Sequence, residues 1–330
     1  MLRKLHLALK FPVDYKIAGG TTNTIIEHKE LCEIKNRLIW GQGSQKSSEG
    51  VSEKNRNKIN NQISNGHNTY TFFLANNKGN RELYVGKMSN IYGRGKIPFG
   101  SSLIQYIPIY YASTIGTPAD QNNVFVDVCT FFRIVDKYIG DITLVKNGDK
   151  VIDVRNSSSV FLVNITEELD NLITGMLSNP EASFQYQVEQ EDVSNDVTVE
   201  DKPKDKTPKT SRSGTSSYKR DSKTSKTAIV TAKYKCEIDE THEDFISKVT
   251  GENYVEAHHL IPMEYQDDFT NSIDVEANIV SLCVACHKKL HHATHPVINP
   301  LIEKIYDDRK DRLRDCGIKI TKTRILEYYR

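Results

Sequence analysis

The stretch AHHLIP, residues 257–262, places two histidines side by side at the end of a short apolar segment that has the character of a β-strand. Neighbouring residues on a strand point to opposite sides, so His258 and His259 are expected to have different surroundings and different tasks. A second stretch, NIVSLCVACHKKLHH at residues 278–292, supplies two further histidines and a pair of cysteines. Together the two stretches predict a strand and a helix that share metal-binding side chains.

The spacing in the second stretch predicts two separate metal sites. His287 and His291 are four residues apart, which places both on one face of a helix and within reach of a single ion. Cys283 and Cys286 have the C-x2-C spacing of a zinc knuckle. Because Cys286 and His287 are adjacent, they project in different directions from a helix and do not share one ion. We therefore expect a thiolate-rich zinc that stabilises the fold and an imidazole site on the helix face.

The adjacent histidines of AHHLIP complete this arrangement. One of them can join His287 and His291 on the ion. The other can stay beside the ion as a free base, and an imidazole with a pKa of about 6.5 is suited to removing a proton from water near neutral pH.

Length and composition indicate two domains and a linker. The chain has 330 residues, 38% of them hydrophobic, and a formal net charge of +1, so a contact with nucleic acid must come from local patches. No apolar run reaches the roughly 18 residues that span a bilayer, and MLRKLHLALKFPVDYK reads as the start of a folded domain, so we expect no membrane partner and a cytoplasmic location. The six cysteines do not form a dense framework, and disulfides are not expected.

A change in composition separates the expected domains. Residues 184–227 contain few aliphatic side chains, and their charges are acidic in the first part and basic in the second. Such a segment buries too little apolar area to offset its ordering entropy, so we expect a disordered linker. Its basic half could contact DNA phosphates or serve solubility alone.

Residues 1–183 are expected to form a β-barrel-like domain with flanking helices. Five stretches are rich in β-branched and aromatic residues, at 70–75, 82–88, 103–111, 123–135 and 159–165. A helix is expected after Asn164 as its cap, ending before Pro180. Residues 228–330 open with short strands and turn to helices, one of them over 300–318. The expected fold class of the whole chain is therefore α+β.

The histidine pattern resembles the HNH nuclease motif of the ββα-metal family, and the words YVEAHHLIPM and ANIVSLCVACHKKLHH are similar to its restriction-type members. The resemblance covers residues 230–330. It implies that His258, His287 and His291 bind a catalytic Mg²⁺, Mn²⁺, Co²⁺ or Ni²⁺ ion, that His259 is the general base, and that Asn278 braces the loop between strand and helix. It also implies hydrolysis of DNA phosphodiesters.

The structural zinc site departs from the common four-cysteine form. Cys236 is present, but the position expected to complete a C-x2-C pair with it holds Asp239. His242 lies nearby, and we infer that zinc is bound by Cys236, His242, Cys283 and Cys286. Asp239 and Cys316 remain alternatives within the first pair, Cys236 and His242.

The order of the pieces resembles modification-dependent restriction enzymes, in which an EVE-like barrel of the PUA superfamily precedes the HNH domain. The resemblance implies that the first domain holds a flipped, modified cytosine such as 5-methylcytosine in an aromatic pocket, as part of defence against phage. Candidate pocket residues are Trp40, Tyr70, Tyr84, Tyr110 and Tyr111. Cutting both strands of double-stranded DNA with one site per chain suggests a homodimer.

Two other functions fit the sequence. The chain could be an HNH nuclease effector of another anti-phage system whose first domain senses a ligand or a partner. It could also be a non-catalytic, zinc-stabilised protein that binds nucleic acid, although that function leaves His259, Asn278 and His291 without a role.

Overall fold

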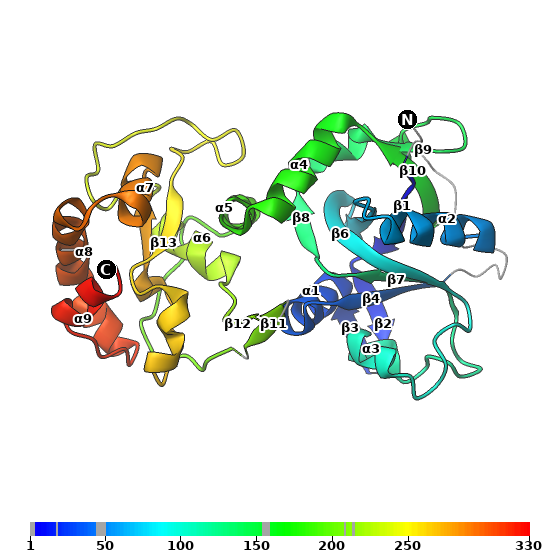
Figure 1. Cartoon of the computed structure of the whole chain (residues 1–330), viewed down its shortest axis with the longest axis horizontal. Coiled ribbons are helices and arrows are strands. Elements are labelled where there is room, and N and C mark those ends of the chain that lie inside the picture. The colour runs from blue at the N-terminus through cyan, green and yellow to red at the C-terminus, as the bar shows by residue number, and fades with distance from the viewer. Residues whose placement is uncertain (1–3, 18, 44–50, 154–158, 208, 213–214) are drawn as a thin grey trace. The chain divides into compact units, whose positions relative to one another are not determined.

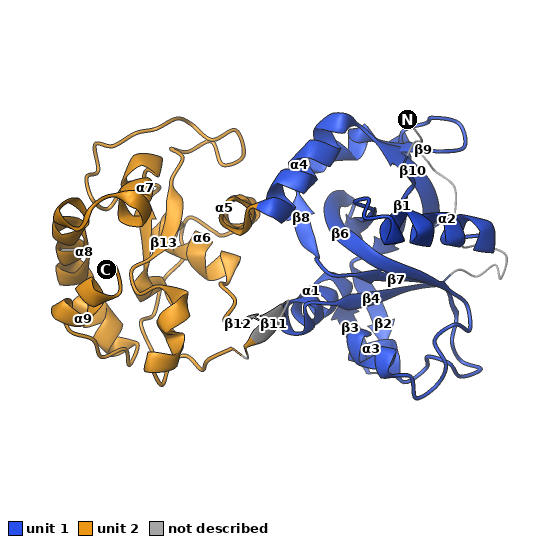
Figure 2. Ribbon diagram, viewed as in Figure 1, with its two compact units in different colours: residues 1–178 blue, residues 179–330 orange. Residues whose placement is uncertain are grey.

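The computed structural model describes residues 4–17, 19–43, 51–153, 159–207, 209–212 and 215–330 (Figure 1). The chain forms two compact units, residues 1–178 and residues 179–330 (Figure 2). Strands dominate the first unit and helices the second, so the chain belongs to the mixed class that the sequence predicts. Among the described residues, no helix combines the length and the apolar character needed to cross a membrane.

Eight strands of the first unit form one mixed sheet in the order β4-β7-β6-β5-β1-β10-β9, with β8 paired to β6. β1 runs parallel to β5 and all other pairs are antiparallel. The strands are β1 (His6–Pro12), β4 (Leu38–Gly43), β5 (Tyr70–Asn77), β6 (Asn80–Gly93), β7 (Asn122–Val128), β8 (Phe132–Ile134), β9 (Ile142–Leu144) and β10 (Val160–Ile165), and a separate hairpin joins β2 (Asp14–Ile17) to β3 (Gly20–Asn23).

The sheet curves around one apolar core but does not close. Buried side chains from β1, β4, β5, β6 and β7 enter the same cluster, which includes Leu9, Trp40 and Phe73. The long strand β6 makes this possible, because it pairs with β5 along its first half and with β7 along its second half, where a bulge lies between Met88 and Asn90. The expected closed barrel is not found among the described residues, since β4 and β9 are each paired on one side only.

The stretch 103–111 is not the strand that its composition predicts. It forms the 3-10 turn η1 (Ser102–Tyr106) and the short helix α3 (Ile109–Ala112). Ser101 begins the turn by accepting a hydrogen bond from the backbone N–H of Leu103 at 3.2 Å, and Pro108 begins the helix without an N–H of its own. The apolar residues of this region pack in a small separate core against Ile39 and Phe125, so tertiary packing outweighs β-propensity here.

The other helices of the first unit are α1 (Thr24–Lys35), α2 (Glu53–Ser64) and α4 (Glu167–Ser178). α4 is the helix expected between Asn164 and Pro180, and its apolar stripe buries Leu169, Ile173 and Met176. Its capping hydrogen bond comes from Thr166, whose hydroxyl accepts from the N–H of Leu169. The expected cap Asn164 instead belongs to β10, and Pro180 does more than stop the chain, since it opens the next helix.

The second unit is built on a two-stranded sheet packed against helices. β13 (Glu256–His259) pairs with β14 (Ile279–Leu282), and α7 (Val284–His292) follows β14 at once. α8 (His295–Asp315) begins five residues before the expected helix, with Pro296 in its first turn and Pro300 inside it, and Gly317 follows its end at φ 74°. The remaining elements are α5 (Pro180–Gln190), β11 (Thr210–Arg212), β12 (Thr215–Ser217), α6 (Ser222–Thr231) and α9 (Lys322–Glu327), besides 3-10 turns at Met263–Asp268 and Glu276–Asn278.

The stretch 184–227, expected to be a disordered linker, contributes to the second unit where it is described. α5 and α6 pack on each other and on the hairpin through a cluster that includes Phe184, Ile229 and Ala257. In the segment of sequence that links α5 to α6, Asp201 forms a bidentate ion pair with Arg312, accepting two hydrogen bonds from its guanidinium group. The few apolar residues of this stretch thus pack against the β13–β14 hairpin, and ion pairs fix its polar part to the second unit. Residues 208, 213 and 214 lie outside the described part.

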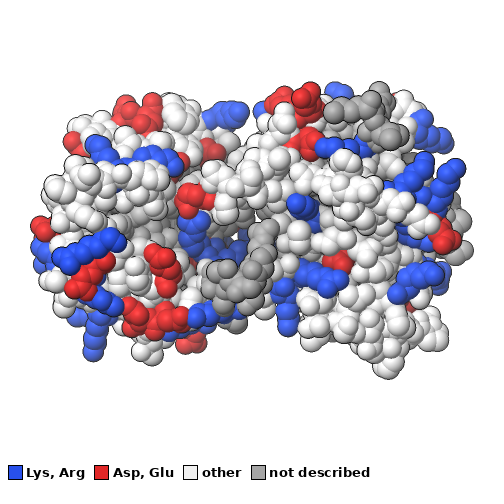
Figure 3. All heavy atoms as spheres, viewed as in Figure 1, with Lys and Arg blue, Asp and Glu red and all other residues white. Residues whose placement is uncertain are grey.

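Charge is divided unequally between the units. Lysine and arginine outnumber aspartate and glutamate by 21 to 16 over residues 1–178, and they are outnumbered by 23 to 27 over residues 179–330. On the face drawn in Figure 3, residues of both signs are interspersed over each unit. The net charge of the chain therefore conceals a basic excess in the first unit.

Candidate metal centres

The β13–β14 hairpin and helix α7 bring the two histidine-containing stretches together. In the hairpin His258 lies opposite Val280 and His259 opposite Ile279. Cys283 caps α7, because its Sγ accepts a hydrogen bond from the N–H of Cys286 at 3.4 Å. The turn from β14 into the helix thereby fixes the position of the cysteine pair.

Three cysteines and one histidine form a group that can hold a metal ion. Cys236, His242, Cys283 and Cys286 each offer one ligand atom, and these four atoms lie within 4.8 Å of one another. Nδ1 of His242 is 3.6 Å from Sγ of Cys283 and 3.5 Å from Sγ of Cys286. A sulfur and a nitrogen bound tetrahedrally to one zinc ion would be about 3.6 Å apart, from bond lengths of about 2.3 and 2.0–2.1 Å. The donor set and its spacing therefore fit zinc.

The alternative ligands lie elsewhere. Asp239 is 3.7 Å from Nε2 of His242, the ring nitrogen that faces away from the sulfurs, and it also accepts hydrogen bonds from Thr241. Cys316 lies in the core at the end of α8, with its Sγ 3.9 Å from Asp201. Neither belongs to the group of four.

The thiols of this group have perturbed pKa values. Burial, together with the two neighbouring thiols, raises the pKa of Cys286 to about 12. Burial also works against a thiolate at Cys236, but hydrogen bonds from the backbone of Cys283 and Asp239 outweigh it and lower its pKa. A dication among thiols reverses the repulsion that resists their ionisation, so this clustering of buried thiols is well suited to a metal ion.

A second group joins β13 to α7. His258, His287 and His291 each place one nitrogen within 4.8 Å of the others. His258 and His287 are buried and His291 is exposed, which leaves one open side. Burial lowers the pKa of His258 well below its ordinary value, and it lowers the pKa of His291 as well. Both imidazoles therefore favour the neutral form that binds metals.

Hydrogen bonds to neighbouring residues orient this second group. Nδ1 of His287 lies 2.6 Å from a carboxylate oxygen of Glu256. An ionised carboxylate only accepts, so Nδ1 carries the proton and Nε2 keeps its lone pair. Nε2 of His287 lies 3.1 Å from Nε2 of His291, close to the ~3.3 Å expected for two nitrogens bound to one tetrahedral ion. The pair is arranged as ligands of a common ion would be.

His258 is oriented by the last turn of the chain. Its Nε2 lies 2.9 Å from the hydroxyl of Tyr329, and that hydroxyl donates to the carbonyl of Leu260 at 2.8 Å. With the hydroxyl proton used in this way, Nε2 of His258 is the donor to the Tyr329 oxygen. The lone pair of His258 is then on Nδ1, available to a metal ion.

His259 has different neighbours, as strand alternation predicts. Its Nε2 lies 2.8 Å from Oδ1 of Asp274, and both side chains are buried. Its ring centroid lies 6.4 Å from that of Phe184 on α5. One histidine of AHHLIP therefore faces the metal-binding group and the next faces a carboxylate.

Asn278 joins the two ends of the long loop that connects β13 to β14. The side chain is fully buried, its Oδ1 accepts from the N–H of Ile261 at 2.8 Å, and its Nδ2 donates to the carbonyls of Ile261 and Ile273. The side chain of Asn278 therefore braces the loop that leads into β14.

Helix α5 covers the free edge of β13. The amide of Gln185 both accepts from the N–H of Ala257 at 2.9 Å and donates to its carbonyl at 2.7 Å, as a neighbouring strand would. Arg220 stacks on Phe184 and pairs with Glu181 at 2.7 Å. These contacts place one cation and one carboxylate near the histidines, whose pKa values both groups influence.

In the first unit, four of the five aromatic candidates belong to one linked set. Trp40 stacks on His28 at 3.6 Å between ring centroids, and the ring of His28 also packs near the rings of Tyr110 and Tyr111. Tyr84 is connected to Trp40 through Phe131, which stacks on both rings. Tyr70 lies apart, stacked on His6. Trp40 is only 3% exposed and belongs to the core.

Glu256, Asp274, Tyr329 and Gln185 are residues of the site that the sequence motifs do not indicate. Only Glu256 carries a local signal, because it lies two residues before His258 and hence on the same side of the strand. No family model matches the sequence, and no curated protein matches it.

Proposed function

We propose that the protein is a metal-dependent DNA endonuclease of the HNH type. The observation that carries the proposal is the convergence of His258, His287 and His291, together with a fourth imidazole, His259, that is the next residue of β13 and is held by a carboxylate. Three imidazoles supply an ion site, and the fourth supplies a base. The hairpin followed by a helix supports the same proposal, because it is the arrangement that the ββα-metal resemblance implies.

In the proposed reaction, His258, His287 and His291 hold Mg²⁺, Mn²⁺, Co²⁺ or Ni²⁺, with the later metals favoured by imidazole ligands. When bound there, the ion would supply positive charge that stabilises the negative charge developing on the phosphate and the leaving oxygen. His259 takes a proton from the water that attacks phosphorus. The bond from phosphorus to the 3′ oxygen breaks, and that oxygen gains a proton from solvent. The products are a 5′-phosphate and a 3′-hydroxyl.

We also propose zinc as the ion of the Cys236, His242, Cys283 and Cys286 group. Three sulfurs and one nitrogen are a zinc donor set, and four protein ligands leave no open position for a reaction. The ion would fasten the segment around Cys236 to the start of α7. It would thus stabilise the helix that carries His287 and His291.

For the first unit we propose recognition of modified cytosine in double-stranded DNA, with an EVE-like reader ahead of the nuclease. The basic excess of this unit and its linked aromatic set support the proposal. Trp40 would support such a pocket from behind, because it is buried. Tyr110 is only half-buried and is better placed to meet a base.

The test is digestion of matched plasmids, one with 5-methylcytosine and one without, by the full chain with each of the four metals. We expect cleavage of the modified plasmid, reduced about 10²–10⁴-fold in His259→Ala. His292→Ala is the matched control, since His292 is an exposed histidine of the same helix outside the metal-binding group.

The outcomes separate the candidate functions. Equal cleavage of both plasmids supports a nuclease effector of another defence system. Binding without cleavage under every metal supports the non-catalytic protein. Wild-type cleavage by His259→Ala removes this residue from the mechanism.

A further inference from the structure

We infer that Asp274 is a positioning residue for His259, holding it as the Nε2–H tautomer so that Nδ1 is the atom that receives the proton of the attacking water. The inference rests on the proposed nuclease function. It adds a residue that lies fifteen positions beyond His259 in the sequence, outside the histidine motif.

The first step of the argument is the contact itself. Nε2 of His259 is 2.8 Å from Oδ1 of Asp274, and the side chains are 4% and 7% exposed. An ionised carboxylate has no proton to give, so the imidazole is the donor. A neutral imidazole that donates from Nε2 has its lone pair on Nδ1. The atom of His259 that can accept a proton is therefore Nδ1.

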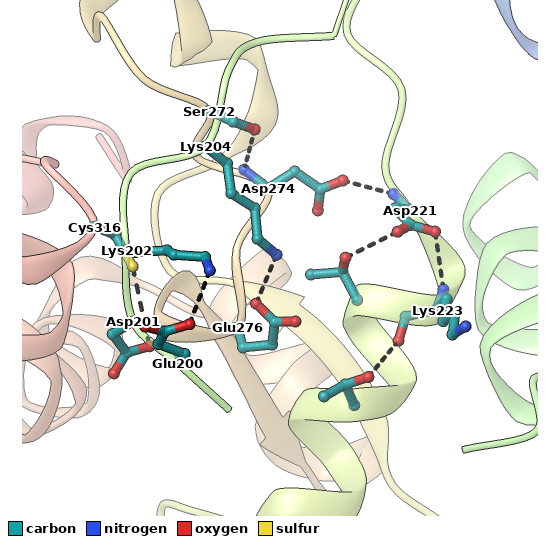
Figure 4. A network of polar contacts seen from close by, with 12 residues as sticks. Glu200, Asp201, Lys202, Lys204, Asp221, Lys223, Ser272, Asp274, Glu276 and Cys316 are labelled. Atoms are coloured by element: carbon teal, nitrogen blue, oxygen red, sulfur yellow. Dashed lines mark hydrogen bonds and ion pairs between the residues drawn. The ribbon is translucent and has the colours of Figure 1, made fainter. Parts of the chain in front are cut away.

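The second step is that the carboxylate is itself fixed (Figure 4). Its other oxygen, Oδ2, accepts from the backbone N–H of Asp221 at 2.6 Å, and the N–H of Asp274 donates to Ser272 Oγ at 3.2 Å. The preceding residue is held too, since the N–H of Ile273 donates to the side chain of Gln266 at 2.8 Å. With both carboxylate oxygens engaged, Asp274 cannot turn away from His259, and the imidazole ring is held in one orientation.

The third step concerns the other ring nitrogen. Within the described part of the chain, Nδ1 of His259 makes no hydrogen bond to protein, in contrast to Nδ1 of His287, which is tied to Glu256. An imidazole with one nitrogen anchored on a carboxylate and the other unengaged is prepared to accept a proton. Once it has done so, the carboxylate stabilises the imidazolium that forms.

A purely structural role for the Asp274–His259 pair is the alternative, and the tautomer distinguishes the two. In the full-length protein with its zinc bound and no catalytic metal added, the two-bond ¹⁵N–¹H correlations of the histidine rings identify which nitrogen carries the proton. We expect His259 as Nε2–H in the wild type, assigned by its loss in His259→Ala. A wild-type His259 in the Nδ1–H form overturns the inference and needs no variant that could fail to fold.

The variants Asp274→Asn and Asp274→Glu provide the kinetic readout. An asparagine amide can donate to Nε2 and so favour the wrong tautomer, whereas glutamate restores the carboxylate. We expect kcat of Asp274→Asn to fall about 10²–10⁴-fold with KM within twofold, and Asp274→Glu to recover a measurable part of it. The control Asp311→Asn removes an exposed carboxylate on α8 and should leave kcat unchanged.

The two proposals fail in different ways. If Asp274→Asn keeps the wild-type kcat while His259→Ala is inactive, the inference is overturned and the nuclease stands. If His259→Ala is fully active, the proposed mechanism fails, and the role of Asp274 in catalysis fails with it. The positioning role is also overturned if Asp274→Asn loses kcat, Asp274→Glu does not recover it, and His259 in Asp274→Asn keeps the Nε2–H tautomer.

Discussion

The two buried histidines of the first unit make its stability depend on pH, and this dependence can be derived from their surroundings. Burial lowers the pKa of His28 to about 3 and that of His6 to about 4. His28 lies on α1 and stacks on Trp40, and its Nδ1 donates to the carbonyl of Thr24. Nδ1 of His6 accepts from the N–H of Tyr70, so a proton on that atom would remove the hydrogen bond.

The sign follows from the direction of these shifts. Both folded pKa values lie below the value of about 6.5 in an unfolded chain, so the unfolded state binds more protons as the pH falls. The stability is fully present above pH 6.5 and is lost as the pH falls toward 4 and then 3. Below about pH 6.5 each histidine costs about 1.4 kcal/mol per pH unit, so the roughly 1.5 units down to pH 5 cost about 2 kcal/mol for each histidine, or about 4 kcal/mol in all.

The measurement is urea unfolding of the full chain at pH 7, 6 and 5, followed by the fluorescence of Trp40. This is the single tryptophan of the protein, so its emission reports on the first unit. A loss of about 4 kcal/mol would lower the midpoint by about 2 M urea. In His28→Phe, which keeps a ring against Trp40, the loss between pH 7 and pH 5 should be halved. The exposed His67→Phe should leave it unchanged.

Two results would refute this reasoning. One is a midpoint that does not move between pH 7 and pH 5. The other is a His28→Phe variant with the full pH dependence of the wild type, which would show that His28 is protonated in the folded state.

The other predictions concern the second unit. Cys286→Ser should lose the bound zinc and make the second unit sensitive to protease, because structural zinc contributes folding free energy directly; unchanged metal content beside the control Cys129→Ser would contradict this. Glu256→Ala should weaken Mn²⁺ binding at the histidine group about 10–100-fold in calorimetric titration, since it removes the carboxylate that orients His287, and an unchanged affinity would show that this carboxylate is dispensable. Asn278→Ala should lower the free energy of unfolding by roughly 2–4 kcal/mol in urea unfolding followed by circular dichroism, because it leaves buried backbone groups of Ile261 and Ile273 without partners; a loss below about 0.5 kcal/mol would argue against the brace.

The sequence by itself determined the features that depend on short spacing. His287 and His291 share a helix face because four residues nearly complete a turn, and adjacent histidines on β13 must diverge. Strands β5, β6 and β10 were likewise predicted from their β-branched and aromatic runs. In each case the decisive geometry lies within a few residues of backbone, and the local sequence is sufficient.

Only the tertiary structure decided which distant residues meet these motifs. Tyr329 contacts His258 across 71 residues of sequence, and Gln185 contacts Ala257 across 72. No periodicity encodes such separations, because they depend on how loops close over a shared core. The same reason explains three features that the local sequence does not reveal. Trp40 is buried by the curvature of the whole sheet, and residues 103–111 form turns because a small core holds them. α5 is recruited from an apparently featureless segment because the edge of β13 needs a hydrogen-bonding partner, which Gln185 supplies.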